Sequence, residues 1–132
     1  MISSLETVWA PRLLSVLRIM TALLFMEHGT MKLLNFPASD NPGPALFSLI
    51  GFAGMLELVG GLLLVLGLFT RPVAFILSGQ MAVAYFMAHA PHSFFPAVNK
   101  GEGAILFCFV FLYLVAAGAG PWSVDAARRS NA

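Results

Sequence analysis

The stretch PALFSLIGFAGMLELVGGLLLVLGLF, residues 44–69, decides the fold class of this chain. It carries a single ionisable residue, Glu57, and at about 1.5 Å per helical residue it is long enough to cross about 30 Å of hydrocarbon. Three further mainly apolar runs occupy residues 11–34, 71–90 and 101–118. The sequence therefore predicts an all-α integral membrane protein, a four-helix transmembrane bundle forming a single domain over residues 1–132.

The composition supports this prediction. The chain is 59% hydrophobic and only 10% charged, whereas a soluble domain carries about 25% charged residues because its surface lies in water. The formal net charge is +1 and there is no run of Lys or Arg, which argues against a nucleic-acid-binding protein. The one cysteine, Cys108, lies among apolar residues and is expected to serve packing.

Turn-forming residues mark the ends of the predicted helices. Pro11, Pro44 and Pro72 fall near helix starts, where a missing backbone N–H is tolerated. Thr70 is expected to cap the third helix, and Gly118 is expected to end the fourth.

The positive charges predict the orientation. Positively charged residues near span ends collect on the cytoplasmic side of a membrane. Lys32 and Lys100 flank one side, and the other side has more positive charges: Arg12, Arg71, Arg128 and Arg129, with Arg18 just inside. Both termini are therefore expected to face the cytoplasm (N-in/C-in).

Ionisable side chains within a span are functional candidates, because they are costly to place in lipid. With antiparallel helices, most of the polar side chains gather toward the outer leaflet: Glu27, His28, Lys32, His89, His92, Lys100 and Glu102. His28, Lys32, Tyr85 and His89 could donate hydrogen bonds to a bound polar group. The simpler alternatives are that the lysine reaches the headgroups and that the histidines are solvated.

The deepest carboxylate is Glu57, flanked by glycines that let helices approach closely. Glu57 is predicted to pair with Arg18 on the first helix, and it could serve either as a hydrogen-bonding group or in proton handling. Glu27 and Glu102 are further candidates for proton handling. For Glu102 the alternative is a capping box with Asn99 that opens the fourth helix.

A metal or haem site is not expected. His89 and His92 have a possible ligand spacing, with Glu27 and Glu102 nearby, but Pro91 interrupts the shared helix face. Bis-histidine haem ligation would require His28 and His89 to face each other, and no other feature supports it.

These residues resemble the DoxX family of small bacterial membrane proteins. The resemblance covers residues from about Arg12 to Asp125. Its motifs are Arg18-x9-His28-Gly29-x-x-Lys32, Glu57-Leu-Val-Gly60-Gly61 through Thr70-Arg71, then His89, Phe94-Phe95, Asn99, Gly101-Glu102 and Gly120-Pro-Trp122-Ser123-x-Asp125.

The resemblance implies a four-helix bundle in the bacterial cytoplasmic (inner) membrane and an association with redox systems. Some relatives form the membrane part of thiosulfate:quinone oxidoreductases, and others accompany enzymes that handle thiols, peroxides or catechol-type quinones. Because Cys108 is alone, direct sulfur chemistry by this chain would require a partner or a bound cofactor.

Three functions follow as hypotheses. The first is a quinone-interacting subunit of a membrane redox system, in which the chain would be one subunit of an oxidoreductase. The second is a non-catalytic anchor or assembly factor for a soluble or membrane redox enzyme. The third is a small transporter or proton conduit, although no inverted repeat is visible. The glycines of the second span would also permit packing between copies in a homo-oligomer.

Overall fold

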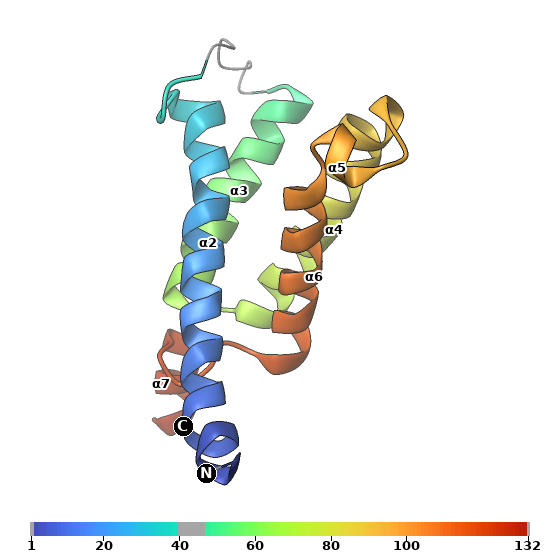
Figure 1. The fold of residues 1–132 in the computed structure, drawn as a ribbon. Helices are drawn as coiled ribbons and strands as arrows, with labels where there is room; N and C mark the ends of the chain where they lie inside the picture. Colours follow the sequence, from blue (N-terminus) through green and yellow to red (C-terminus); the bar gives the residue numbers. More distant parts are fainter. Residues whose placement is uncertain (1, 40–46, 132) are drawn as a thin grey trace.

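The computed structural model describes residues 2–39 and 47–131, and every regular element in these two ranges is helical. Four long helices form the body: α2 (Ala10–Leu34), α3 (Leu49–Leu66), α4 (Thr70–Ala84) and α6 (Glu102–Ala117) (Figure 1). The shorter elements are α1 (Ile2–Ser4), the π-helix η1 (Leu5–Trp9), the π-helix η2 (Tyr85–His89), the 3-10 helix η3 (Ala90–His92), α5 (Pro96–Asn99) and α7 (Val124–Ser130).

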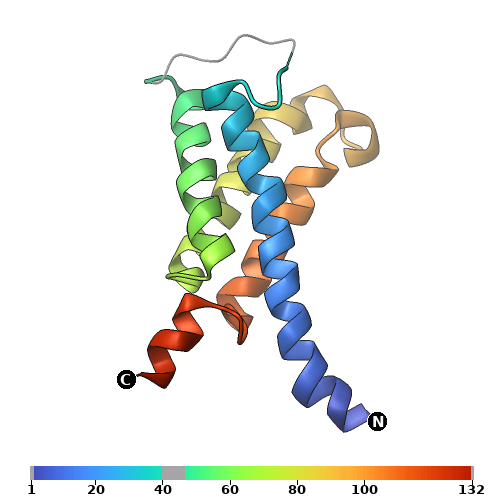
Figure 2. The same ribbon diagram turned by 90° about the vertical axis from the view of Figure 1, so that its left-hand side faces the viewer.

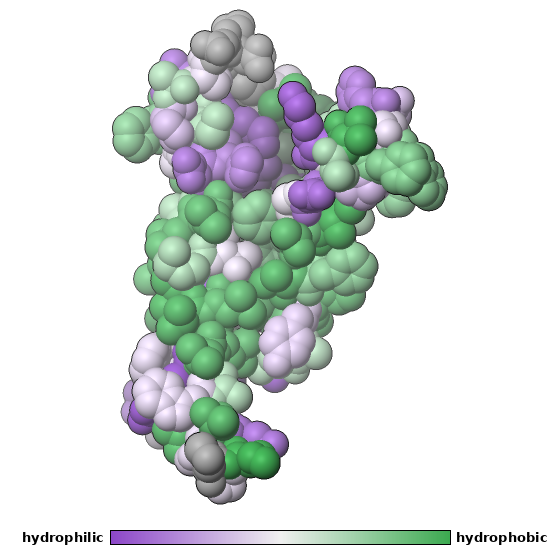
Figure 3. Space-filling view, viewed as in Figure 1, coloured by the Kyte–Doolittle hydropathy of each residue, from purple (hydrophilic) through white to green (hydrophobic). Residues whose placement is uncertain are grey.

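The all-α membrane architecture is confirmed. Three continuous helical segments are long and apolar enough to cross a membrane, Ile2–Leu34, Leu49–Leu66 and Thr70–His92. The fourth apolar helix, Glu102–Ala117, is shorter, so four complete crossings and the orientation of the termini stay predictions. Figure 3 shows apolar residues across the middle of one face of the molecule, with hydrophilic residues gathered mainly at the end opposite the termini.

The four long helices form two antiparallel pairs, α2 with α3 and α4 with α6. Figures 1 and 2 show both termini at one end of the molecule, here called the termini end, and the opposite end is called the loop end. The two pairs lie apart at the loop end (Figure 1). Between them, Phe25 of α2 packs edge-on against Phe107 and Phe111 of α6, at ring-centroid distances of 5.4 and 4.9 Å.

The α2–α3 pair is close because a glycine lies at the crossing. A Cβ atom on Gly29 would lie 2.8 Å from the Leu58 nitrogen and 2.9 Å from the Gly54 oxygen, both backbone atoms. No side chain fits at Gly29 unless one of the helices moves. Glycine at this position therefore lets the backbone of α2 approach the backbone of α3 near Gly54.

Two of the long helices continue through π turns: η1 extends the first helix before its predicted start at Pro11, and η2 forms the last part of the predicted third span. In each case the sequence Ala-Pro follows the turn, at Ala10-Pro11 and at Ala90-Pro91. The Ala10 N–H donates to the Leu5 oxygen, and the Ala90 N–H donates to the Tyr85 oxygen. A wider turn keeps these amides bonded next to a residue that has no N–H.

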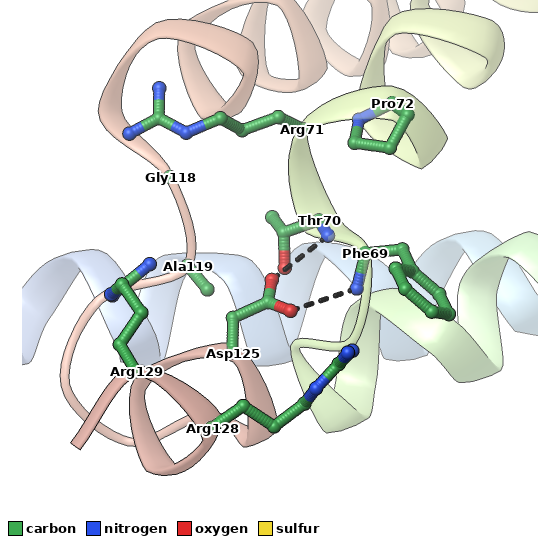
Figure 4. Close-up of a pocket in the computed structure, with 9 residues that line it drawn as sticks. All are labelled: Phe69, Thr70, Arg71, Pro72, Gly118, Ala119, Asp125, Arg128 and Arg129. Atoms are coloured by element: carbon green, nitrogen blue, oxygen red, sulfur yellow. Dashed lines mark hydrogen bonds between the residues drawn. The ribbon is translucent and has the colours of Figure 1, made fainter. Parts of the chain in front are cut away.

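The cap predicted for the third helix is wrong in one respect. Thr70 is already the first residue of α4, because Phe69 makes the turn in the left-handed conformation (φ 53°). The acceptor comes instead from α7, whose Asp125 carboxylate binds the Phe69 N–H at 2.9 Å and the Thr70 N–H at 3.0 Å (Figure 4). Gly118 ends α6, as predicted.

The predicted capping box at the fourth helix is also wrong. Lys100 is left-handed (φ 63°), so α5 ends at Asn99 and α6 begins only at Glu102. The Asn99 Oδ1 atom accepts from the Gly101 N–H at 2.8 Å instead. Glu102 is an exposed first-turn residue.

Candidate ligand site between α3 and α4

Glu57 is the centre of a polar cluster inside the bundle. Its side chain is only 3% exposed, and the Lys32 Nζ atom lies 2.6 Å from Oε1 and 2.8 Å from Oε2. Lys32, which is 31% exposed, comes from the last turns of α2 and reaches Glu57 on α3. The ammonium thereby neutralises a carboxylate that would be costly to bury alone.

Gln80 of α4 completes this cluster. Its Nε2 atom donates to Glu57 Oε1 at 3.4 Å and to the Ala53 oxygen at 3.3 Å. Its Oε1 atom is buried and has no hydrogen-bond partner among the described residues. Gln80 is not among the residues predicted from the sequence, although an amide inside an apolar run is a usable signal.

These three side chains lie at a groove of about 660 Å³ between α3 and α4. The other lining residues are apolar or small: Leu49, Ile50, Phe52, Ala53, Leu56, Ile76, Gly79, Val83, Ala84, Met87 and Ala88. The groove is therefore apolar along its walls and polar at one place, where Lys32, Glu57 and Gln80 meet.

The packing of α3 on α4 explains where this groove begins. Gly60 lies directly against Leu77, since a Cβ atom on Gly60 would lie 2.9 Å from both Leu77 Cδ atoms. Closer to the loop end, Gly79 has no atom within 4 Å of where its Cβ would be. The helices therefore touch at Gly60 and leave space beyond it, at the level of Glu57.

The predicted Arg18–Glu57 ion pair is wrong. Arg18 is fully buried, and its guanidinium donates to backbone carbonyls at the end of α3 and in the segment before α7: Leu64 (2.8 Å), Val65 (3.4 Å), Trp122 (2.7 Å) and Ala119. Leu64 is seven residues beyond Glu57, about 10 Å along the helix. The end of α3 offers Arg18 carbonyls at its own level that lack the usual partner four residues further on, whereas Lys32 reaches Glu57 from the other direction.

Tyr85 and His89, predicted to act with Lys32, have a different set of partners. Their rings stack at a centroid distance of 6.4 Å, His89 Nδ1 lies 3.0 Å from the Asn99 oxygen, and Asn99 Nδ2 donates to the Tyr85 hydroxyl at 3.1 Å. Asn99 is 4% exposed and also donates to the Ser93 oxygen. This arrangement holds the segment between α4 and α6 in place.

The remaining candidates are exposed. His28 lies edge-on to Phe107 at 6.0 Å, between α2 and α6, and Glu27 and Glu102 are exposed residues of α2 and α6. His92 is exposed on η3. Within residues 2–39 and 47–131, no group of three or more His, Cys, Asp or Glu residues is placed to hold a metal ion.

The site can therefore bind an amphiphile. The ammonium of Lys32 and the amide of Gln80 are donors, the carboxylate of Glu57 is an acceptor, and the apolar walls suit a hydrocarbon body. The Oε1 atom of Gln80 is an unsatisfied acceptor, and it can accept a hydrogen bond from a ligand or water.

Comparisons with known proteins agree with this membrane architecture. The DoxX family model matches residues 13–90 of the chain. An uncharacterized protein of Haemophilus influenzae is 46% identical over 122 residues, covering 89% of this chain and 91% of its own length. No solved structure matches the chain.

Proposed function

Because this chain belongs to the DoxX family of membrane proteins, we propose that it is a quinone-interacting accessory subunit of a bacterial redox system. The quinone site of this proposal is the groove between α3 and α4. The observation that carries it is the Lys32–Glu57–Gln80 cluster, which lies at a groove with otherwise apolar walls.

The residues of the groove fit the chemistry of a quinone. A quinone has two carbonyl acceptors on an apolar ring, commonly with a hydrocarbon tail, so it needs donors at the ring and an apolar path for the tail. Lys32 and Gln80 are such donors, and Phe52, Ile76 and Met87 are among the apolar lining residues. The volume of about 660 Å³ is typical of small-molecule sites. When bound, a quinone supplies two-electron, two-proton redox chemistry.

The chain's own contribution is to bind, orient and move protons. Lys32 Nζ and Gln80 Nε2 orient a carbonyl by hydrogen bonding, and Glu57 accepts or releases a proton at its carboxylate. Lys32 is 31% exposed while Glu57 is 3% exposed, so Lys32 links the buried carboxylate to the loop end. Electrons would come from a soluble or membrane redox enzyme that works with this chain.

The same proposal includes the setting of the protein. It lies in the cytoplasmic (inner) membrane with four crossings and both termini in the cytoplasm. The excess of arginine at the termini end supports this orientation. The groove then opens to the lipid in the outer half of the membrane, from which a quinone can enter sideways.

The test is to purify the protein from native membranes in mild detergent and to quantify quinone by extraction and mass spectrometry. We expect near-stoichiometric quinone in the wild type and at least a fivefold loss in Glu57→Gln. The matched control is Glu102→Gln, which makes the same change on an exposed residue at the loop end.

Equal quinone in all three proteins would contradict the groove as the site. A folded wild-type protein without quinone would overturn the proposed function. It would favour the alternative of a membrane anchor or assembly factor, and the soluble protein that co-purifies would then be the next measurement.

A further inference from the structure

A second cavity system lies at the termini end of the molecule, separate from the groove that contains Glu57. Two adjoining pockets, of about 380 and 720 Å³, share Arg71, Arg129 and the Gly118-Ala119 segment that follows α6. In Figure 4 both guanidinium groups lie toward the left of the view, that of Arg71 above the Gly118-Ala119 segment and that of Arg129 below it. The cavity system is therefore flanked by two guanidinium groups.

Among residues 2–39 and 47–131, neither arginine has a carboxylate oxygen within 4.0 Å, although the charge of Arg129 acts on the Asp125 carboxylate. Within the described ranges, the one ion pair with a nitrogen–oxygen distance of 4.0 Å or less is Lys32–Glu57. The nearby carboxylate of Asp125 caps α4. Arg71 donates through Nη1 to the Val115 oxygen at 2.8 Å and the Ala116 oxygen at 2.6 Å, which fixes its position and leaves Nη2 to bind another group.

The larger pocket adds an apolar wall. Pro11 and Leu14 of α2 and Tyr113 and Ala117 of α6 line it, and Glu6 of η1 lines its edge. Because α2 packs chiefly on α3 and α6 chiefly on α4, this pocket lies between two helices that are not each other's main packing partner. A crevice between α2 and α6 therefore runs from the arginines toward the apolar middle of the molecule.

The level of this cavity in the molecule matches that of a membrane interface. Trp9 and Trp122 are both exposed near this end, and the Arg12 guanidinium lies 5.5 Å from the Trp9 ring centroid. Tryptophan and arginine are enriched at the level of the lipid headgroups. A ligand here would meet headgroups at the arginines and hydrocarbon at α2 and α6.

We propose that this cavity binds an anionic phospholipid, with its phosphate between Arg71 and Arg129 and an acyl chain along the α2–α6 crevice. Guanidinium groups bind phosphate oxygens through paired N–H donors, and anionic lipids are attracted to basic pockets at helix ends. Neither a free anion nor a neutral lipid uses both the charge and the apolar wall.

The test is native mass spectrometry of the purified full-length protein, titrated with phosphatidylglycerol or with phosphatidylcholine of the same chain length. We expect phosphatidylglycerol to bind at least fivefold more tightly than phosphatidylcholine. Arg129→Gln should reduce this preference at least fivefold. Arg12→Gln is the matched control, because Arg12 is at the same end and lines neither pocket; it should retain the preference.

Two further arms separate the sources of the phosphate. Glycerophosphoglycerol, the same headgroup without acyl chains, and inorganic phosphate should each compete only at far higher concentration than the lipid. Competition at equal concentration would overturn the lipid assignment. So would equal binding of the two lipids, or an equal loss in Arg12→Gln and Arg129→Gln. Circular dichroism and gel filtration confirm that each variant is folded before it is scored.

Discussion

At the scale of single residues, the fold depends on a fully buried arginine, Arg18, that has no carboxylate within hydrogen-bonding distance in the part of the chain that the structure describes. Arg18 donates to Leu64 and Val65 at the end of α3 and to Ala119 and Trp122 after α6. Carbonyls at a helix end lack partners within the helix. One planar guanidinium thus satisfies carbonyls from two segments that are far apart in sequence, and it joins the first hairpin to the C-terminal segment.

We predict that Arg18→Lys destabilises the protein by about 2–4 kcal/mol. The compact ammonium group cannot reach the carbonyls of both α3 and the segment after α6, so some of these buried carbonyls lose their hydrogen bond. The measurement is the apparent Tm in mild detergent. Arg12→Lys, an exposed change on the same helix, is the control and should have little effect. Equal Tm values for Arg18→Lys and wild type would show that the carbonyl contacts contribute nothing to stability.

At the scale of elements, α7 is held to the start of α4 by Asp125. Burial by itself raises the pKa of this carboxyl, but hydrogen bonds from Thr70 and Phe69 and the charge of Arg129 outweigh it and leave the pKa below its ordinary value. A carboxylate at a helix N-terminus is also favoured by the helix dipole. Asp125 therefore stabilises the fold only in its ionised form.

The pH dependence follows from the sign of this shift. Because the folded pKa is lowered, the stabilisation is fully present above the unfolded value near pH 4 and is lost as pH falls through the folded pKa. We predict that Asp125→Asn lowers the free energy of unfolding at pH 7 by about 0.5–2 kcal/mol, which is measured as a lower Tm. The difference in Tm between the variant and the wild type should shrink below about pH 4. A constant difference from pH 7 to pH 3 would contradict this account.

The α2–α3 crossing gives a sharper test of packing. We predict that Gly29→Ala destabilises the protein by about 1–3 kcal/mol, because its Cβ atom would meet two backbone atoms within 3.0 Å. Gly79→Ala is the control, since nothing lies within 4 Å of its Cβ position and alanine favours a helix. If the two variants have the same Tm, the close approach of α2 and α3 is not what stabilises the pair.

The helices could be predicted from the sequence because lipid imposes length and apolar composition on each span. The partners of the polar groups could not. Hydropathy gives the approximate depth of Glu57 but does not show that Lys32 reaches it from the loop end. It also does not show that a left-handed Phe69 transfers the capping of α4 from Thr70 to Asp125. Both depend on tertiary contacts between distant segments.

The proposed site illustrates the same limit. Lys32 and Glu57 stood out as charges within apolar runs, and both line the α3–α4 groove. Gln80 lies deeper in its span and on a different helix face from Tyr85 and His89, so the sequence does not group it with the other candidates. Tyr85 and His89 share a helix face, as their spacing indicates, but their hydrogen-bond partner is Asn99 of the following segment. A shared face does not specify which neighbour it meets.

At the scale of the whole molecule, two helix pairs meet at the termini end and lie apart at the loop end (Figures 1 and 2). The α3–α4 groove and the pocket lined by α2 and α6 are openings between helices of this arrangement. An apolar ligand dissolved in the membrane can reach such openings without passing through water. This property suits a protein that exchanges quinone with the lipid.

The orientation can be tested by cysteine labelling in a Cys108→Ser background. We predict that an impermeant maleimide labels Ser39→Cys from the outside of intact spheroplasts, whereas Ser3→Cys and Ser130→Cys react only after permeabilisation. Ser3 and Ser130 lie near the two termini, and Ser39 lies at the loop end. Outside labelling of Ser130→Cys as well as Ser39→Cys, with Ser3→Cys still protected, would mean that α6 does not cross the membrane.

The central claim is that quinone binds between α3 and α4, and photolabelling tests it most directly. A photoreactive quinone analogue, activated on the purified wild-type protein, should label peptides of α3 and α4 around Glu57 and Gln80. Excess unlabelled quinone should suppress the labelling, and Glu57→Gln should weaken it. Labelling confined to α2 and α6 near His28, or labelling that unlabelled quinone does not suppress, would contradict the account.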